Sequence, residues 1–242
     1  MKNQMLQELV LANRILFNEG VLDGFGHVSA RDPSNPERFH ISRMIAPALV
    51  TTDDLLEVDL EGMVHDAQER RTYVERFIHS EIYKARPEVQ SIVHSHSPTV
   101  IPFGVTGARL RPVCHMSGFL GGKTPVYEIR DFIGERSSLL VTNQKLGKAL
   151  ADTLGANNVA LMRGHGSVAV GTSIKQAVYR AIYTEVNARL QAQSLQLGDP
   201  VYLTDGECED TTEAMEVHLD RPWQLWARRA RAAALDEYGP PA

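Results

Sequence analysis

The sequence predicts a single α/β domain in which helices and strands are interspersed. Its 242 residues are 43% hydrophobic, which is enough to bury one substantial core. Segments of alternating polar and apolar residues predict strands, and Leu56–Leu60 is the clearest of them. Between such segments lie stretches with apolar residues at helical spacing, such as Leu6–Glu19, which predict amphipathic helices.

The composition argues against several classes of partner. The formal net charge is −5, the sequence pI is about 6.0, and no basic stripe is visible, so we expect no nucleic-acid partner. No apolar run approaches the roughly 18 residues that span a bilayer, and the start lacks the apolar core of a signal peptide. The two cysteines, Cys114 and Cys208, are too far apart in the sequence to suggest a disulfide framework. We therefore expect a cytoplasmic protein that acts on a small molecule and does not bind a membrane.

The elements can be placed along the chain in order. Helices are predicted over 6–19, 72–85, 143–154 and 173–195. Strands are predicted at the end of 24–31 and over 38–43, 56–60, 63–65, 89–96, 159–162 and 167–170, with a short strand and loop over 110–116. The glycine-rich stretch 118–122 predicts a flexible loop.

The last forty or so residues have a different character. Residues 206–216 are acidic, Trp223 and Trp226 share a helical face, and 239–241 predicts a disordered end. We therefore divide the chain into a main domain, 1–205, and a C-terminal extension, 206–242. The extension is expected to pack on this domain or on a neighbouring subunit.

Two histidines at alternate positions, His94 and His96, form the first candidate site. In an extended strand, alternate side chains point to the same face, so the two imidazoles converge. Converging neutral imidazoles suit a divalent ion such as zinc, manganese or iron. The alternative is that one histidine is merely polar and the other forms a local hydrogen bond, so a metal site requires further ligands.

His165 and Glu75 are the candidates for those further ligands. His165 lies between two glycines in a tight turn joining two predicted strands, an arrangement that leaves its imidazole exposed. Glu75 lies on the helix that leads into the histidine strand and can project across the same site. Three histidines and one carboxylate make a closed or nearly closed metal shell. Taken alone, His165 is equally well explained as a solvated turn residue and Glu75 as an ordinary helix carboxylate.

Three motifs then occur in order along the chain: Gly26-His27-Val28-Ser29-Ala30-Arg31, His94-Ser95-His96-Ser97-Pro98 and Arg163-Gly164-His165-Gly166. Together, over roughly residues 5 to 200, they resemble the class II aldolase/adducin head family. The resemblance implies a three-layer α/β/α sandwich with a central, mainly antiparallel sheet. It implies one divalent ion per subunit, held by His94, His96 and His165, with Glu75 as a fourth ligand or as the acid/base. It also implies a homotetramer with active sites at the subunit interfaces.

The sequence departs from the sugar-phosphate aldolases of that family where those enzymes hold a phosphate. Their asparagine, Ser/Thr-Gly pair and Ser-Ser pair correspond here to His27, Ser42-Arg43 and Tyr73-Val74. A phosphate needs several small donors, which these replacements remove, so we expect phosphate binding to be lost or rebuilt. Arg43 and His27 are better suited to a planar carboxylate.

A second departure is the stretch Arg111–Gly121, which resembles the decarboxylase branch of the family. That branch includes 3-hydroxy-2-methylpyridine-4,5-dicarboxylate decarboxylase and dihydroxyphthalate decarboxylases. The substrate-binding candidates are His27, Ser29, Arg43 and Phe119, with Phe119 suited to an aromatic ring. The catalytic candidates are Glu75 and His115, since either residue type can protonate a carbon near neutral pH when suitably placed.

These inferences predict a divalent-metal-dependent decarboxylase that acts on a hydroxy-aromatic or related cyclic carboxylate in a catabolic pathway. The metal would polarise an oxygen next to the carboxylate and stabilise the electron pair left when carbon dioxide departs. The alternative is a class II aldolase or dehydratase acting on a small, unphosphorylated hydroxy-carbonyl compound. A third hypothesis is a non-catalytic scaffold, as in adducin heads that have lost the metal histidines, but this sequence retains all three.

Overall fold

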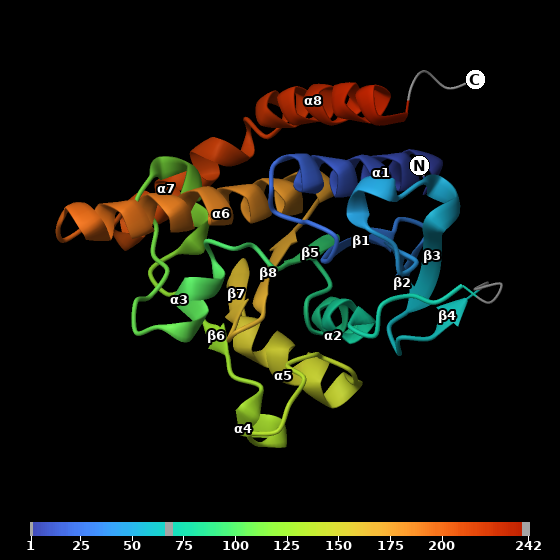
Figure 1. Ribbon diagram of the computed structural model, residues 1–242, viewed down its shortest axis with the longest axis horizontal. Coiled ribbons are helices and arrows are strands. Elements are labelled where there is room, and N and C mark those ends of the chain that lie inside the picture. The colour runs from blue at the N-terminus through green and yellow to red at the C-terminus, as the bar shows by residue number, and fades with distance from the viewer. Residues whose placement is uncertain (1, 66–69, 239–242) are drawn as a thin grey trace.

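The computed structural model describes residues 2–65 and 70–238 and has three layers (Figure 1). An eight-stranded sheet lies between two layers of helices. The strands are β1 (His27–Asp32), β2 (Asn35–Ser42), β3 (Leu55–Asp59), β4 (Val64–His65), β5 (Ser91–Ser95), β6 (Val126–Tyr127), β7 (Val159–Met162) and β8 (Gly166–Gly171). The α-helices are α1 (Lys2–Asn18), α2 (Arg76–Ala85), α3 (Ile101–Val105), α4 (Arg130–Ile133), α5 (Gln144–Leu154), α6 (Ile174–Leu197), α7 (Asp205–Glu216) and α8 (Asp220–Tyr238). Short 3-10 helices are η1 (Pro47–Leu49), η2 (Thr52–Asp54) and η3 (His115–Leu120).

The sheet is mainly antiparallel, with strand order β4-β3-β2-β1-β5-β8-β7-β6. Among the strand pairs of residues 2–65 and 70–238, only β6–β7 is parallel. The predicted fold class is therefore confirmed. The central strands β1, β5 and β8 bring distant motifs together, since His27 on β1 lies opposite His94 on β5, and β5 pairs along its length with β8.

The alternation of side chains divides the core between the two faces of the sheet. On β5, Val93 faces the core that includes residues of α1, α6 and α8, whereas Ile92 faces the core that includes residues of α2 and α5. The helices begin at local caps: the Ser173 hydroxyl accepts the Gln176 N–H at α6, and Asn143 caps α5 in the same way. His94, two residues after Ile92 on β5, faces the same side of the sheet as the second core.

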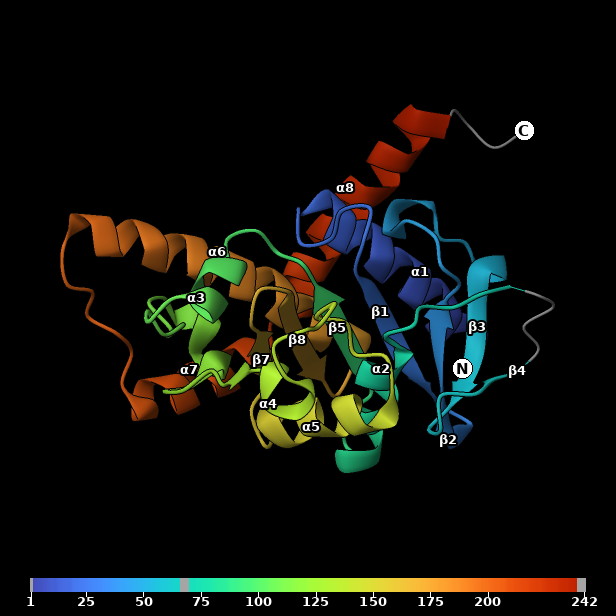
Figure 2. The ribbon, with the colours of Figure 1, turned by 60° about the horizontal axis from the view of Figure 1, so that its bottom comes forward.

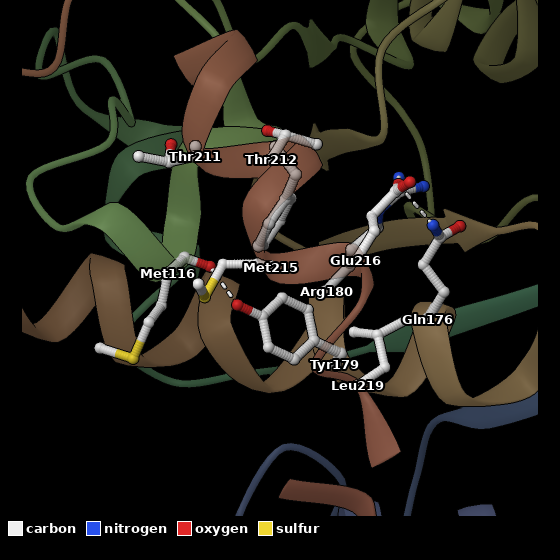
Figure 3. A pocket seen from close by; sticks show the side chains of 11 residues that line it. Met116, Gln176, Tyr179, Arg180, Thr211, Thr212, Met215, Glu216 and Leu219 are labelled. Atoms are coloured by element: carbon white, nitrogen blue, oxygen red, sulfur yellow. Dashed lines mark hydrogen bonds and ion pairs between the residues drawn. The ribbon is translucent and has the colours of Figure 1, made fainter. Parts of the chain in front are cut away.

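Helices α7 and α8 pack on earlier elements of the same chain, α7 on η3 and α8 on α1 and α6. Helix α8 runs beside α1 in both ribbon views (Figures 1 and 2). Trp223 and Trp226 are buried in the same core as residues of α1 and α6. Figure 3 shows how α6 meets α7 and η3: the Gln176 amide donates to Glu216 of α7, and the Tyr179 hydroxyl donates to the carbonyl oxygen of Met116 in η3 (2.8 Å). The end predicted to be disordered, 239–241, lies outside the described residues.

Two predicted elements differ in the structure. The helix predicted over 72–85 begins only at Arg76, because Thr72 forms a β-bridge with Arg43 and the Tyr73 hydroxyl donates to the Ile45 carbonyl oxygen. Glu75 is consequently the N-cap residue and not a residue inside the helix.

The strand predicted within 110–116 is absent from the described residues. The N–H groups of Arg111 and Val113 donate to the side chains of Gln191 and Asn187 on α6, so no neighbouring strand takes these bonds. The stretch predicted to be a flexible loop begins within η3. There, an added Cβ at Gly118 would lie 2.8 Å from a carbonyl oxygen of α7. Among residues 2–65 and 70–238, no helix is both long and apolar enough to cross a lipid bilayer.

Candidate metal centre

Four residues from distant parts of the chain meet at one end of the central strands: Glu75, His94, His96 and His165. Their potential ligand atoms all lie within 4.8 Å of one another. His94 is the penultimate residue of β5 and His96 follows that strand, while His165 lies in the turn between β7 and β8. The strand and the glycine-flanked turn bring the three histidines together, and Glu75 reaches them from the N-cap of α2.

The distances within the cluster suit a single small cation. His96 Nε2 lies 3.2 Å from His94 Nε2 and 3.0 Å from His165 Nε2. The Glu75 carboxylate oxygen Oε2 lies 3.6 Å and 3.5 Å from the Nε2 atoms of His94 and His165. A tetrahedral ion with bonds of about 2.0–2.1 Å holds its ligand atoms about 3.3 Å apart. The four side chains thus fit around a divalent ion with little rearrangement.

Hydrogen bonds on the outer side of the rings orient their lone pairs. His94 Nδ1 donates to the Ser167 carbonyl oxygen (3.1 Å), and His165 Nδ1 donates to the Leu139 carbonyl oxygen (2.9 Å). Because a carbonyl oxygen can only accept, each proton lies on Nδ1 and each Nε2 lone pair faces the cluster. Burial lowers the pKa of His96 to about 4, so that ring is neutral near pH 7.

Glu75 supplies negative charge to the cluster. Its Oε1 accepts the Val141 backbone N–H (3.0 Å), which leaves Oε2 directed at the ring nitrogens. Burial alone would raise the pKa of this carboxyl group, but its interactions with His165 and His94 outweigh burial and hold the pKa well below its usual range. An ionised carboxylate beside three imidazoles is a donor set suited to zinc, manganese or iron.

The segment that carries His96 is fixed from two sides. The hydroxyls of Ser97 and Thr99 both donate to the Glu185 carboxylate on α6, at 2.5 Å each. On the other side, β8 approaches so closely that a Cβ added at Gly166 would lie 2.0 Å from the Ser95 carbonyl oxygen. The glycine therefore permits the close approach that holds His96 beside His165.

Gly166→Ala is expected to force β8 away from β5 and to destabilise the protein by about 2 kcal/mol, because the added methyl overlaps backbone atoms. Urea unfolding would measure the loss, and titration with zinc should show weakened binding, because His165 moves with the strand. Gly107→Ala is the matched control, since its Cβ would point into open space. Equal stability of the two variants would contradict this explanation of Gly166.

His27 lies next to the cluster but turns one nitrogen away from it. Its ring centroid is 5.0 Å from that of His94, and its Nδ1 lies 2.7 Å from His79 Nε2. Burial lowers the pKa of His79 to about 3, and burial together with the neighbouring imidazoles lowers the pKa of His27 well below its usual range. Ser29 lies behind His79, with its hydroxyl 2.7 Å from His79 Nδ1 and 2.8 Å from the Tyr83 hydroxyl.

The structure does not bring the remaining predicted site residues into the cluster of one chain. Arg43 donates through Nε to Asp54 (2.6 Å), and Phe119 is buried in the core, where its ring meets Tyr179. His115 is exposed at the start of η3, in a groove of about 540 Å³ that is also lined by Tyr183.

Two residues near the site were not assigned from the sequence. His79 contacts His27, and the only sequence signal for it is its position one helical turn after Glu75. Phe25 is 71% exposed, and its ring centroid lies 6.4 Å from that of His96. A single aromatic residue between two glycines carries too little pattern to be recognised as part of a site.

Comparison with known proteins identifies the family. Residues 7–192 match the family described as the class II aldolase and adducin N-terminal domain, and the chain belongs to that family. Decarboxylase tropJ of Talaromyces stipitatus is 42% identical over 91% of this chain and 92% of its own length. A 3,4-dihydroxyphthalate decarboxylase of Arthrobacter keyseri is 29% identical over 79% of each chain. The resemblance to this family and to its decarboxylases is therefore confirmed.

The fold agrees with the sequence relationship. The L-fuculose 1-phosphate aldolase from Glaciozyma antarctica matches the structure with a TM-score of 0.80 at 27% identity, over 98% of this chain and 92% of that one. Decarboxylation and aldol cleavage both break a carbon–carbon bond, so the family and these relatives support a lyase, with a potential metal-binding cluster of histidine and glutamate at its centre.

Proposed function

We propose that the protein is a divalent-metal-dependent decarboxylase of a hydroxy-aromatic or related cyclic carboxylate. The observation that carries the proposal is the convergence of three imidazole Nε2 atoms and one carboxylate oxygen at distances that suit one ion. Relatives that are decarboxylases, one of them named for 3,4-dihydroxyphthalate, support the reaction and the substrate class.

The residues around the cluster suit an aromatic acid better than a sugar phosphate. The Tyr73 hydroxyl donates to the Ile45 carbonyl oxygen and is therefore not free to donate to a phosphate. Val74 is half exposed and apolar, and the exposed Phe25 offers a ring beside His96. A flat, apolar substrate with a polar edge is complementary to these groups.

In the proposed reaction, His94, His96 and His165 would hold the ion, with Glu75 completing its shell or acting as the acid/base. A bound divalent ion supplies Lewis-acid polarisation of an oxygen next to the carboxylate that leaves. His27 lies beside His94, where it can bind a substrate oxygen. Either Glu75 or His115 donates the proton to the ring carbon. Since His115 is outside the cluster of its own chain, it would act on a neighbouring subunit in the homotetramer that we propose.

The proposal predicts carbon dioxide release from hydroxylated benzene and pyridine carboxylates that have a hydroxyl next to the carboxylate. Each acid should be tested with protein loaded in turn with zinc, manganese and iron(II). The matched controls are the same acids with that hydroxyl methylated or moved to the meta position, which we expect to be inert. Chelation should abolish the release, and added metal should restore it.

The alternative, an aldolase or dehydratase acting on a small unphosphorylated hydroxy-carbonyl compound, is supported by the structural match to a fuculose-phosphate aldolase. Cleavage of unphosphorylated hydroxy-keto acids, with no carbon dioxide from any aromatic acid, would favour it and contradict the decarboxylase.

A further inference from the structure

A chain of buried hydrogen bonds runs from the edge of the candidate metal centre into the core beside α2. It joins His27 Nδ1 to His79 Nε2 and His79 Nδ1 to the Ser29 hydroxyl, each at 2.7 Å. The Ser29 hydroxyl lies 2.8 Å from the Tyr83 hydroxyl, where the chain ends. All four side chains are at most 2% exposed. Within the described parts of the chain, none of these side chains has another hydrogen-bond partner.

The number of hydrogens limits how this series of hydrogen bonds can be arranged. Two hydroxyls and two neutral imidazoles carry four hydrogens, but only three hydrogen bonds join them. Both nitrogens of His79 take part in links, so its hydrogen always lies within one. The single hydrogen left over therefore belongs to the Tyr83 hydroxyl, to the Ser29 hydroxyl or to His27 Nε2.

Only one of these arrangements leaves both buried hydroxyl hydrogens paired. A hydrogen left over on Tyr83 or Ser29 would be a buried hydroxyl donor without an acceptor, which costs the desolvation of that group. A hydrogen left over on His27 Nε2 lies instead at the metal-centre end, beside His94, on a nitrogen that is not among the fully buried side-chain atoms without a partner in the described residues, so water or a ligand can accept from it. This difference favours the third arrangement by roughly tenfold to a hundredfold.

We infer that Ser29 and His79 are positioning residues that hold His27 as its Nε2–H tautomer, so that His27 presents a fixed N–H donor to a ligand bound at the metal centre. In this tautomer His27 Nε2 has no lone pair, so this nitrogen is neither a fourth imidazole ligand nor a base. It is suited to an anionic oxygen such as a substrate carboxylate. The donor role rests on the proposed function, whereas the tautomer does not.

Nitrogen NMR of zinc-loaded protein labelled with 15N-histidine measures the tautomer directly. The His27 signals are assigned by their loss in His27→Asn. We expect a pyridine-type signal from Nδ1 and a pyrrole-type signal from Nε2. A pyrrole-type Nδ1 in the unmodified protein would overturn the inference, whatever the substrate proves to be.

A matched pair of variants tests the role of His79. In His79→Gln the side-chain amide can donate to His27 Nδ1, so the pyridine-type signal should remain. In His79→Glu at pH 8.5 the carboxylate can only accept, so the hydrogen should move to His27 Nδ1. An unchanged His27 spectrum in folded His79→Glu overturns the positioning role. If that variant fails to fold, loss of the pyridine-type signal in His79→Gln overturns the role and its retention supports it.

Salicylate, which has a hydroxyl next to its carboxylate, tests the donor role. Its binding to the zinc-loaded protein should shift the His27 Nε2 signal, and His27→Asn should weaken its affinity about tenfold. Binding that leaves both the signal and the affinity unchanged overturns the donor role. If salicylate does not bind, the result counts against the proposed substrate class and the donor role with it, while the spectrum still decides the tautomer.

Discussion

His96→Ala is expected to remove the bound divalent ion and the decarboxylase activity together while leaving the fold intact. The imidazole provides one of three converging Nε2 atoms, within 3.2 Å of the other two. Loss of one ligand should lower metal affinity at least a hundredfold, since even residues that only orient ligands contribute roughly 10- to 100-fold. Activity should fall about a thousandfold, because the ion supplies several kcal/mol of transition-state stabilisation.

The fold should survive because His96 lies outside β5 and is only partly buried. Metal analysis, carbon dioxide release and thermal unfolding would all be measured, with unfolding carried out in chelator, because a bound ion stabilises the native state by mass action. His65→Ala is the control, since it removes a half-exposed imidazole bonded to Asp59 on the edge of the sheet. A variant that keeps its metal would contradict the cluster as the binding site, and one that unfolds would make His96 structural.

The ligand candidates could be predicted because their signals are local. The alternation of a strand directs His94 and His96 to one side, and glycines on both sides of His165 indicate a tight turn. The sequence placed Glu75 near the three histidines, but it also predicted that Glu75 lies inside a helix that begins at residue 72. In the structure Glu75 is the N-cap residue of α2, because the contacts of Thr72 and Tyr73 with distant residues prevent the helix from beginning at residue 72.

The rest of the site depends on contacts between residues far apart in the sequence. The link between His27 and His79 spans 52 residues, and no periodicity within either segment reveals it. Phe119 was expected near the substrate, but its burial depends on α6 and α7, which follow much later in the chain. The segment 110–116 has the composition of a strand, yet amides on α6 take its backbone bonds. A sequence pattern within one segment does not reveal such contacts with a distant segment.

Glu75→Gln is expected to weaken metal binding at least about tenfold and to lower the turnover number about a hundredfold or more, with little change in the fold. The amide can still accept the Val141 N–H through its oxygen, as Oε1 does in the native protein. It then directs an NH2 group at the cluster where the carboxylate directed Oε2, so the variant loses both the charge and the lone pairs that face the ion.

Metal titration and single-turnover decarboxylation separate the two roles open to Glu75. A ligand requires the metal affinity to fall, whereas an acid/base alone requires full metal occupancy with slow proton delivery to carbon. The distances of 3.5 Å and 3.6 Å from Oε2 to two ring nitrogens favour contact with the ion, so we expect the affinity to fall. Glu81→Gln is the control, because it makes the same change on α2 at a residue paired with Lys84. If Glu75→Gln retained both metal and activity, Glu75 would only be anchoring the Val141 segment, and the ion would be held by the three imidazoles alone.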